Sequence, residues 1–234
     1  MDLQRLRLTF IKGDAFKYTS HLDLARAWER ALRRGGVPLA YSAGFNPRPK
    51  LQLAAALPLG HTGEAELLDV WLEELMPMEV FLRALVPVLP DGLTASRVTL
   101  VGAKEPALQT EIVAAEYIVM VEWRPEMTEA WSDPDEAVEA RIEGVLAAAE
   151  LPQERRGRQY DLRPLIERLW VERVGEGTVV LGMQLAAREG ATARPEAVLE
   201  ALGMGGSFAR YHRRRLLTSG VVLTNKIVSS QLVR

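Results

Sequence analysis

The sequence predicts an α+β fold made of two tandem ferredoxin-like (βαββαβ) domains, the second of them decorated. Residues 1–104 show the order strand, helix, strand, strand, helix, strand, which specifies an antiparallel sheet backed by two helices. Residues 112–234 show a second, less regular round of strands and helices. The stretch GAKEPALQTE (102–111) has the composition of a linker, so we place the two domains at 1–104 and 112–234.

The first domain opens with a strand, because Leu6, Leu8 and Phe10 alternate with polar residues in LQRLRLTFI. A helix follows, with Ser20 as its capping residue and Asp23 three positions later in a capping-box pattern. The remaining elements are strands at 51–57 and 67–75, a helix at 77–90 and a strand at 95–102.

The second domain is expected to begin with a strand at 116–123. Asp133 and Pro134 open a helix, whose apolar residues (Val138, Ile142, Val145, Leu146 and Ala149) share one stripe. The turn GEG joins two strands into a hairpin, and 194–202 is a helix. The pattern assigns no firm element to 151–168.

Charge is segregated along the chain. Lys and Arg outnumber Asp and Glu by ten to four in residues 1–60 and by fourteen to eight in residues 151–234, whereas they are outnumbered five to nineteen in residues 61–150. Basic ends around an acidic middle suggest one surface that faces a polyanion and another that repels it. Charges that neutralise each other in the fold would give the same counts.

The composition excludes several classes of site. The chain has no cysteine, which rules out disulfides, a thiol nucleophile and metal or iron–sulfur sites held by Cys. No carboxylate or histidine spacing indicates a metal site, and we expect no cofactor. The first residues are too charged for a signal peptide, and no apolar run approaches the roughly 18 residues that span a bilayer. We therefore expect a cytoplasmic protein.

Ser20, His21 and Asp23 stand close together in the sequence, as in a hydrolase triad. Neighbouring residues of a helix point about 100° apart, so Ser20 and His21 cannot face each other, and a helix start is the better interpretation. Each of His21, His61 and His212 could serve as a general base, but a lone histidine is more often structural. His21 and His212 are the candidates for catalysis.

The first helix carries a basic face. Arg26, Arg30 and Arg33 recur at i, i+4 and i+7, and Arg34 follows. Guanidinium groups form forked hydrogen bonds to anionic oxygens, so this face suits phosphates. A solvated face with arginines near a helix C-terminus is the alternative.

The stretch YSAGFNPRPKLQL (41–53) predicts a stiff, turn-rich loop that presents Phe45, Arg48 and Lys50. An aromatic ring with two cations suits base stacking and phosphate binding. Alternatively, the loop is a structural connection whose Phe fills the core.

The C-terminal stretch GMGGSFARYHRRRLL (203–217) combines glycines, aromatic residues and Arg213, Arg214 and Arg215. Basic residues between aromatics fit single-stranded nucleic acid, and a basic surface tail is the alternative. The stretch lacks the Gly-Lys-Ser/Thr ending of a phosphate-binding P-loop.

The predicted sheet face opposite the helices carries Arg5, Arg7, Asp69 and a single aromatic residue, Trp71, among other polar residues. RNA-recognition motifs stack bases on two or three aromatics, so that mode of binding is not expected. Asp69 is expected to pair with Arg5 or Arg7 across neighbouring strands.

Residues 16–72 contain SHLDL, a basic helix, PLAYSAGFNPRPKL and a PLG turn before an acidic strand. This run resembles the radical-SAM-linked proteins, a bacterial family of unknown function. YDLRPLI (160–166) and ARPEAVLEALG (193–203) are also similar to segments of that family. The resemblance implies a partner, a radical SAM protein of the B12-binding type, but it assigns no activity to any residue.

Three functions fit these observations. The first is a non-catalytic accessory protein that binds RNA, such as tRNA or rRNA, for modification or processing by a radical SAM enzyme. The second is a protein-docking module that never contacts RNA. The third, from fold-level analogy, is a metal-independent RNA endonuclease like those associated with CRISPR systems, acting through His21 or His212. The sequence favours a non-catalytic protein.

Overall fold

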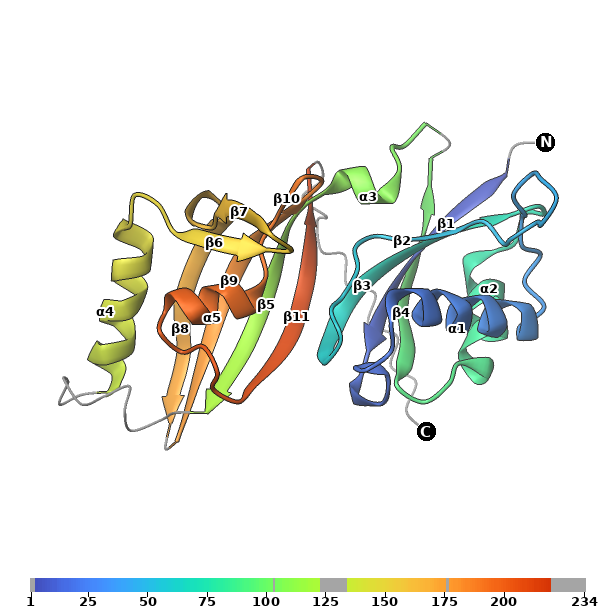
Figure 1. Cartoon of the computed structure of the whole chain (residues 1–234). Coiled ribbons are helices and arrows are strands. Elements are labelled where there is room, and N and C mark those ends of the chain that lie inside the picture. Colours follow the sequence, from blue (N-terminus) through green and yellow to red (C-terminus); the bar gives the residue numbers. More distant parts are fainter. Residues whose placement is uncertain (1–2, 103, 123–133, 176, 220–234) are drawn as a thin grey trace.

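The chain is a mixed α+β protein with one large sheet and several helices (Figure 1), as the predicted class requires. The computed structural model describes residues 3–102, 104–122, 134–175 and 177–219. No helix in these ranges combines the length and the apolar character needed to cross a membrane.

The first half of the chain carries β1 (Gln4–Lys12), α1 (His21–Arg34), β2 (Leu51–Leu53), β3 (His61–Leu72), α2 (Met78–Leu85) and β4 (Leu93–Val101). β1 lies between β3 and β4, and β2 pairs with β3. The alternating Leu6, Leu8 and Phe10 face α1 and α2, where Trp28 and Phe81 complete a buried core. The rings of Phe10 and Trp28 meet edge to face with centroids 4.9 Å apart.

The boundaries of several elements differ from the prediction. β2 ends at Leu53, whereas β3 begins as early as His61. α2 ends at Leu85, because Pro87 has no N–H for a helical hydrogen bond, and the chain continues as a 3₁₀ turn over Val86–Val88.

The second half carries α3 (Leu108–Glu111), β5 (Ile112–Glu122), α4 (Pro134–Ala147), β6 (Pro152–Arg155), β7 (Arg158–Asp161), β8 (Ile166–Gly175), β9 (Thr178–Arg188), β10 (Ala191–Thr192), α5 (Pro195–Ala201) and β11 (Ala209–Thr218). β5 lies between β9 and β11, and β8 and β9 form the predicted hairpin. Val138, Ile142 and Val145 of α4 are buried in a second core. Asp133, the expected helix opener, lies outside the described residues.

β11 joins the two halves into one sheet. It pairs antiparallel with β5 and parallel with β3, where Tyr211 is opposite His61 and Arg213 is opposite Gly63. The basic C-terminal segment is therefore a strand in the middle of the sheet over residues 209–218, and the tail interpretation is wrong for these residues.

The expected linker packs against the sheet face opposite α1 and α2. Arg5 donates hydrogen bonds to the carbonyl oxygens of Glu105 (3.0 Å) and Pro106 (2.8 Å), and Arg7 binds the Glu111 carboxylate (2.7 and 2.8 Å). Both arginines also bind Asp69, which confirms the predicted cross-strand pairing. This face is thus partly covered by residues 104–111 rather than open.

Candidate nucleic-acid interface

The arginines of α1 lie on its exposed side because the opposite side is buried. Leu24, Trp28 and Leu32 pack in the core, and Ser20 caps the helix. Arg26 forms an exposed ion pair with Asp23 (3.1 Å). Among the described residues, no carboxylate lies within ion-pair distance (4.0 Å) of the other three, Arg30, Arg33 and Arg34. These three guanidiniums are available to an external anion.

The loop between α1 and β2 is fixed at its base and free at its tip. The N–H of Ser42 donates to the carbonyl oxygen of Arg48 (2.8 Å), and the N–H of Arg48 donates to the Ser42 hydroxyl (3.0 Å). Phe45 at the tip is 101% exposed, so the core-filling interpretation is wrong. Arg48 and Lys50 are exposed beside it.

A cation–π contact joins the helix to the loop. The guanidinium carbon of Arg33, at the end of α1, lies 5.9 Å from the ring centre of Tyr41, at the base of the loop. The C-terminal end of the arginine face of α1 therefore adjoins the base of the loop. We call the set of Arg26, Arg30, Arg33, Arg34, Phe45, Arg48 and Lys50 the N-terminal basic surface.

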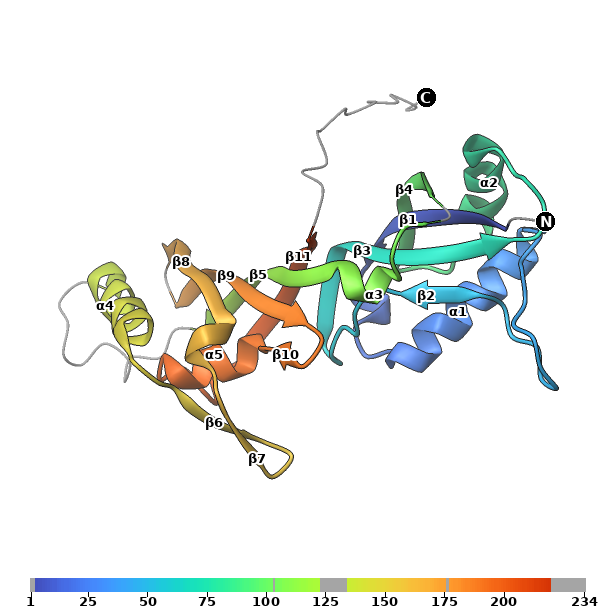
Figure 2. The same cartoon turned by 90° about the horizontal axis from the view of Figure 1, so that it is seen from above.

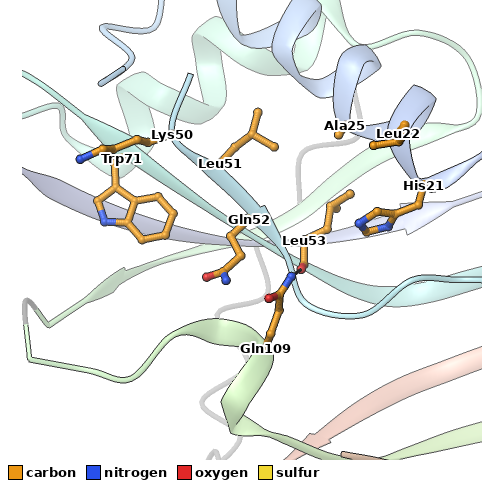
Figure 3. Close-up of a pocket in the computed structure, with 9 residues that line it drawn as sticks. All are labelled: His21, Leu22, Ala25, Lys50, Leu51, Gln52, Leu53, Trp71 and Gln109. Atoms are coloured by element: carbon orange, nitrogen blue, oxygen red, sulfur yellow. Dashed lines mark hydrogen bonds between the residues drawn. The ribbon is translucent and has the colours of Figure 1, made fainter. Parts of the chain in front are cut away.

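A groove of about 600 Å³ lies beside β2, between α1 and α3 (Figure 3). One part is lined by Lys50, Gln52, Trp71 and Gln109, and the other by His21, Leu22, Ala25, Leu51 and Leu53. Gln109 donates a hydrogen bond to the Leu53 carbonyl oxygen (3.2 Å), which holds its amide at the groove. An aromatic ring, two amides and a cation can accept a flat polar group, and Lys50 connects the groove to the N-terminal basic surface. Sequence analysis did not place Trp71 and Gln109 in one groove, because the position of Gln109 depends on how the linker packs.

Arg213 does not belong to an exposed binding surface. Its side chain is 2% exposed, forms a two-point ion pair with Glu66 and donates to the carbonyl oxygens of Ala55 (3.1 Å) and Ala56 (3.3 Å). All of its donors face protein, so the expectation that it binds RNA is wrong.

Arg214 and Arg215 are partly exposed, and both bind Glu116 (3.1 and 2.7 Å). Burial raises the pKa of the Glu116 carboxyl, but the hydrogen bonds from Arg215 and Arg214 outweigh it and lower that pKa below its ordinary value. The carboxylate therefore stays charged and offsets part of the positive charge of both arginines.

The three histidines occupy different surroundings. His21 begins α1, and its Nδ1 is buried without a hydrogen-bond partner among the described residues. Burial and the charge of Arg213 lower its pKa, which keeps the ring neutral. His212 Nδ1 lies 2.8 Å from the Thr62 hydroxyl, and its Nε2 lies 3.4 Å from the Glu64 carboxylate.

His61 is the buried member of a polar cluster that sequence analysis missed. Its side chain is 1% exposed, its Nε2 lies 2.9 Å from the Glu196 carboxylate, and its ring stacks on Tyr211 with centroids 4.6 Å apart. Burial and nearby carboxylates raise the pKa of Tyr211 to about 12. No local signal links these residues, because β3, α5 and β11 meet only in the folded chain. Within the described ranges, no group of three or more His, Asp or Glu side chains could hold a metal ion.

Sequence comparison matches residues 5–195 to a family described as "Uncharacterized protein conserved in bacteria (DUF2344)". No curated protein matches the chain.

The chain is similar to a number of solved structures, three of which follow. One is titled "Crystal Structure of a Cbf5-Nop10-Gar1 Complex" (TM-score 0.51, 11% identity, 94% of this chain and 51% of that chain). The second is "Structure of H/ACA RNP bound to a substrate RNA containing 2'-deoxyuridine" (TM-score 0.48, 11% identity, 91% of this chain and 49% of that chain). The third is "Crystal structure of the archaeal box H/ACA sRNP Nop10-Cbf5 complex" (TM-score 0.46, 14% identity, 94% of this chain and 50% of that chain). The chain spans about half the length of these solved chains, and at 11% identity the first of them shows a likeness of fold alone.

Proposed function

We propose that this chain, which belongs to the DUF2344 family of bacterial proteins, binds RNA through its N-terminal basic surface and has no catalytic activity of its own. The observation that supports the proposal is the contact of Arg33 with Tyr41, which joins the arginine face of α1 to the base of the loop whose tip carries the fully exposed Phe45. Cations that hold phosphates beside an aromatic ring that stacks on a base are the usual elements of single-strand binding. The Cbf5 likeness supports the fold and adds nothing to this argument.

We also propose that the bound RNA is a substrate for a partner enzyme, a radical SAM protein of the B12-binding type in the cytoplasm. The resemblance carried by residues 16–72 supports this partner. In this arrangement the accessory chain holds the RNA, and the cluster chemistry belongs to the partner, since this chain has no cysteine.

The strand orders support tandem ferredoxin-like domains over 1–104 and 112–234. The first four strands are arranged β4-β1-β3-β2, and the corresponding strands of the second half are arranged β11-β5-β9-β8. In each half, the first strand lies between the third and the fourth, as the βαββαβ arrangement requires.

The proposal is tested by titrating the protein with a tRNA transcript at several salt concentrations. Removing two charges, in Arg26→Ala/Arg30→Ala or in Arg48→Ala/Lys50→Ala, should weaken binding, and each lost phosphate contact should lower the salt slope by about 0.7 to 0.9. Phe45→Ala should cost roughly 1–3 kcal/mol of binding free energy if the ring stacks on a base.

The matched control is Arg83→Ala/Arg97→Ala, which removes two exposed arginines from α2 and β4. Wild-type affinity in all three test variants, with unchanged melting temperatures, would contradict the proposal and favour a protein-docking module. Cleavage of the RNA that disappears in His21→Ala or His212→Ala would favour the endonuclease instead.

A further inference from the structure

A second group of arginines lies on the hairpin formed by β6 and β7, in the segment that sequence analysis could not assign. Arg155 is directly opposite Arg158, and Arg156 and Gly157 form the two-residue turn between them. All three arginines are exposed. Among the described residues, no carboxylate lies within ion-pair distance (4.0 Å) of any of them.

The turn holds these arginines at a cost in local stability. Arg156 has φ = 53° and Gly157 has φ = 75°, as in a type I′ turn, and Arg156 is the one non-glycine residue with positive φ in the described chain. Asn or Gly is favoured at this position, since the left-handed region is unfavourable for other side chains. Like charges directly opposite each other, as in Arg155 and Arg158, are also destabilising. Residues held in such strained conformations cluster at functional sites.

The hairpin has a firm base. The N–H of Leu151 donates to the Asp161 carboxylate (2.8 Å), and the N–H of Leu162 donates to the Leu151 carbonyl oxygen (2.9 Å). Tyr160 packs against the core of the second half. The guanidiniums at the tip are therefore presented on an ordered support, which reduces the entropy that binding must remove.

The hairpin and the N-terminal basic surface face the same way. In Figure 1 the hairpin and α1 both lie in front of the sheet, and Figure 2 shows the hairpin and the loop before β2 extending to the same side, the hairpin from the second half and the loop from the far end of the first. The groove is lined by residues of α1, β2 and α3, and β2 lies between the hairpin and the loop in Figure 2.

We infer that the tip of the β6–β7 hairpin is a second phosphate-binding element, which contacts the backbone of the same RNA beyond the N-terminal basic surface. This inference rests on the proposed function. Forked guanidinium bonds to phosphate oxygens match the three arginines, and the turn offers no aromatic ring for stacking, so the contact is independent of base identity.

The test is Arg156→Asn, with binding to the tRNA transcript and thermal melting measured together. Asn suits the turn better than Arg, so the melting temperature should stay the same or rise while affinity falls several-fold. The salt slope should fall by about 0.7 to 0.9 for the lost phosphate contact. Arg173→Ala, which removes an exposed arginine of β8, is the control for loss of one charge in the same half.

The outcomes separate the inference from the proposed function. If Arg156→Asn binds like the wild type while Arg26→Ala/Arg30→Ala is impaired, the hairpin inference is overturned and the N-terminal basic surface remains. Equal losses in Arg156→Asn and Arg173→Ala would also overturn it, because they would indicate a general effect of net charge. If the wild type shows no salt-dependent RNA binding, the proposed function itself fails.

Discussion

Ser20 determines where α1 begins. Its hydroxyl oxygen accepts a hydrogen bond from the N–H of Asp23 (3.1 Å), which satisfies a donor that the helix start leaves free. The hydroxyl also donates to the Asp23 carboxylate (2.7 Å) and thereby lowers the pKa of Asp23. A charged carboxylate in the first turn interacts favourably with the helix dipole.

Ser20→Ala should therefore reduce the free energy of unfolding by about 1 kcal/mol, without changing RNA affinity. Ser20→Asp is the matched control, since aspartate also caps helices and should retain most of the stability. Denaturant unfolding and a binding titration check both variants. Unchanged stability together with lost RNA binding would mean that Ser20 has a chemical role rather than a capping one.

The arginines show when a local sequence pattern can predict whether a side chain is exposed and when it cannot. The exposure of Arg30 and Arg33 follows from local spacing, because helical periodicity places them opposite Leu24 and Trp28. Arg213 stands in a run of arginines that predicts exposure. It is nevertheless buried, because it pairs with Glu66, which lies 147 residues away in the sequence. A local pattern contains no information about such a partner.

At the scale of elements, short strands and turns were the hardest to predict. The β6–β7 hairpin has no apolar alternation, and its turn uses Arg-Gly where Asn-Gly is the recognisable signal. Long elements such as α1 and β1 were predicted because their apolar faces are continuous.

β8, the edge strand beside β9, is held by a contact that its sequence does not indicate: the Trp170 ring lies over Gly182, its cross-strand partner.

Gly182→Ala should destabilise the β8–β9 pairing. A Cβ atom at this position would lie 2.0 Å from the Trp170 ring, so the ring must move. Overpacking of this kind costs about 1–3 kcal/mol, and the fluorescence of Trp170 should shift as the ring becomes more exposed.

Gly175→Ala, in the same hairpin, is the matched control because a Cβ atom there meets only ordinary contacts, the nearest at 3.6 Å. Equal stability of the two variants in denaturant unfolding would show that the Trp170 ring does not depend on the bare glycine.

At the scale of the whole molecule, the continuity of the sheet depends on β11 and β3. Their pairing joins residues 61–63 to residues 211–213 across the boundary between the two halves. The buried apolar residues form two clusters, one of which combines the second half with Ala54 and Leu57 of the first, so most of each cluster could be anticipated from local periodicity. The junction also contains buried polar groups that no hydrophobic pattern indicates. The junction includes Glu66, Arg213 and Lys12, which are 4%, 2% and 1% exposed.

Removing the buried charges of the junction should lower the free energy of unfolding by amounts that follow a defined order. Glu66→Leu leaves both Arg213 and Lys12 buried without their carboxylate, so it should cost about 3–5 kcal/mol of unfolding free energy. Arg213→Met should cost less, because the charge of Lys12 acts on Glu66 in the folded protein and still partly balances it. The double variant Glu66→Leu/Arg213→Met should recover much of the stability lost in Glu66→Leu, since an apolar pair of similar volume replaces the ion pair.

Chemical denaturation of the three variants measures this order, with Glu172→Leu as the control. Glu172 contacts the partly exposed Arg214 (3.4 Å) and accepts a hydrogen bond from Trp170 (3.1 Å), and both contacts are at the surface, so its removal should change stability by no more than about 0.5 kcal/mol. If the double variant were less stable than both single variants, the ion pair would contribute more than its burial costs. The two halves would then depend on this pair, rather than on the backbone pairing of β3 with β11, for their association.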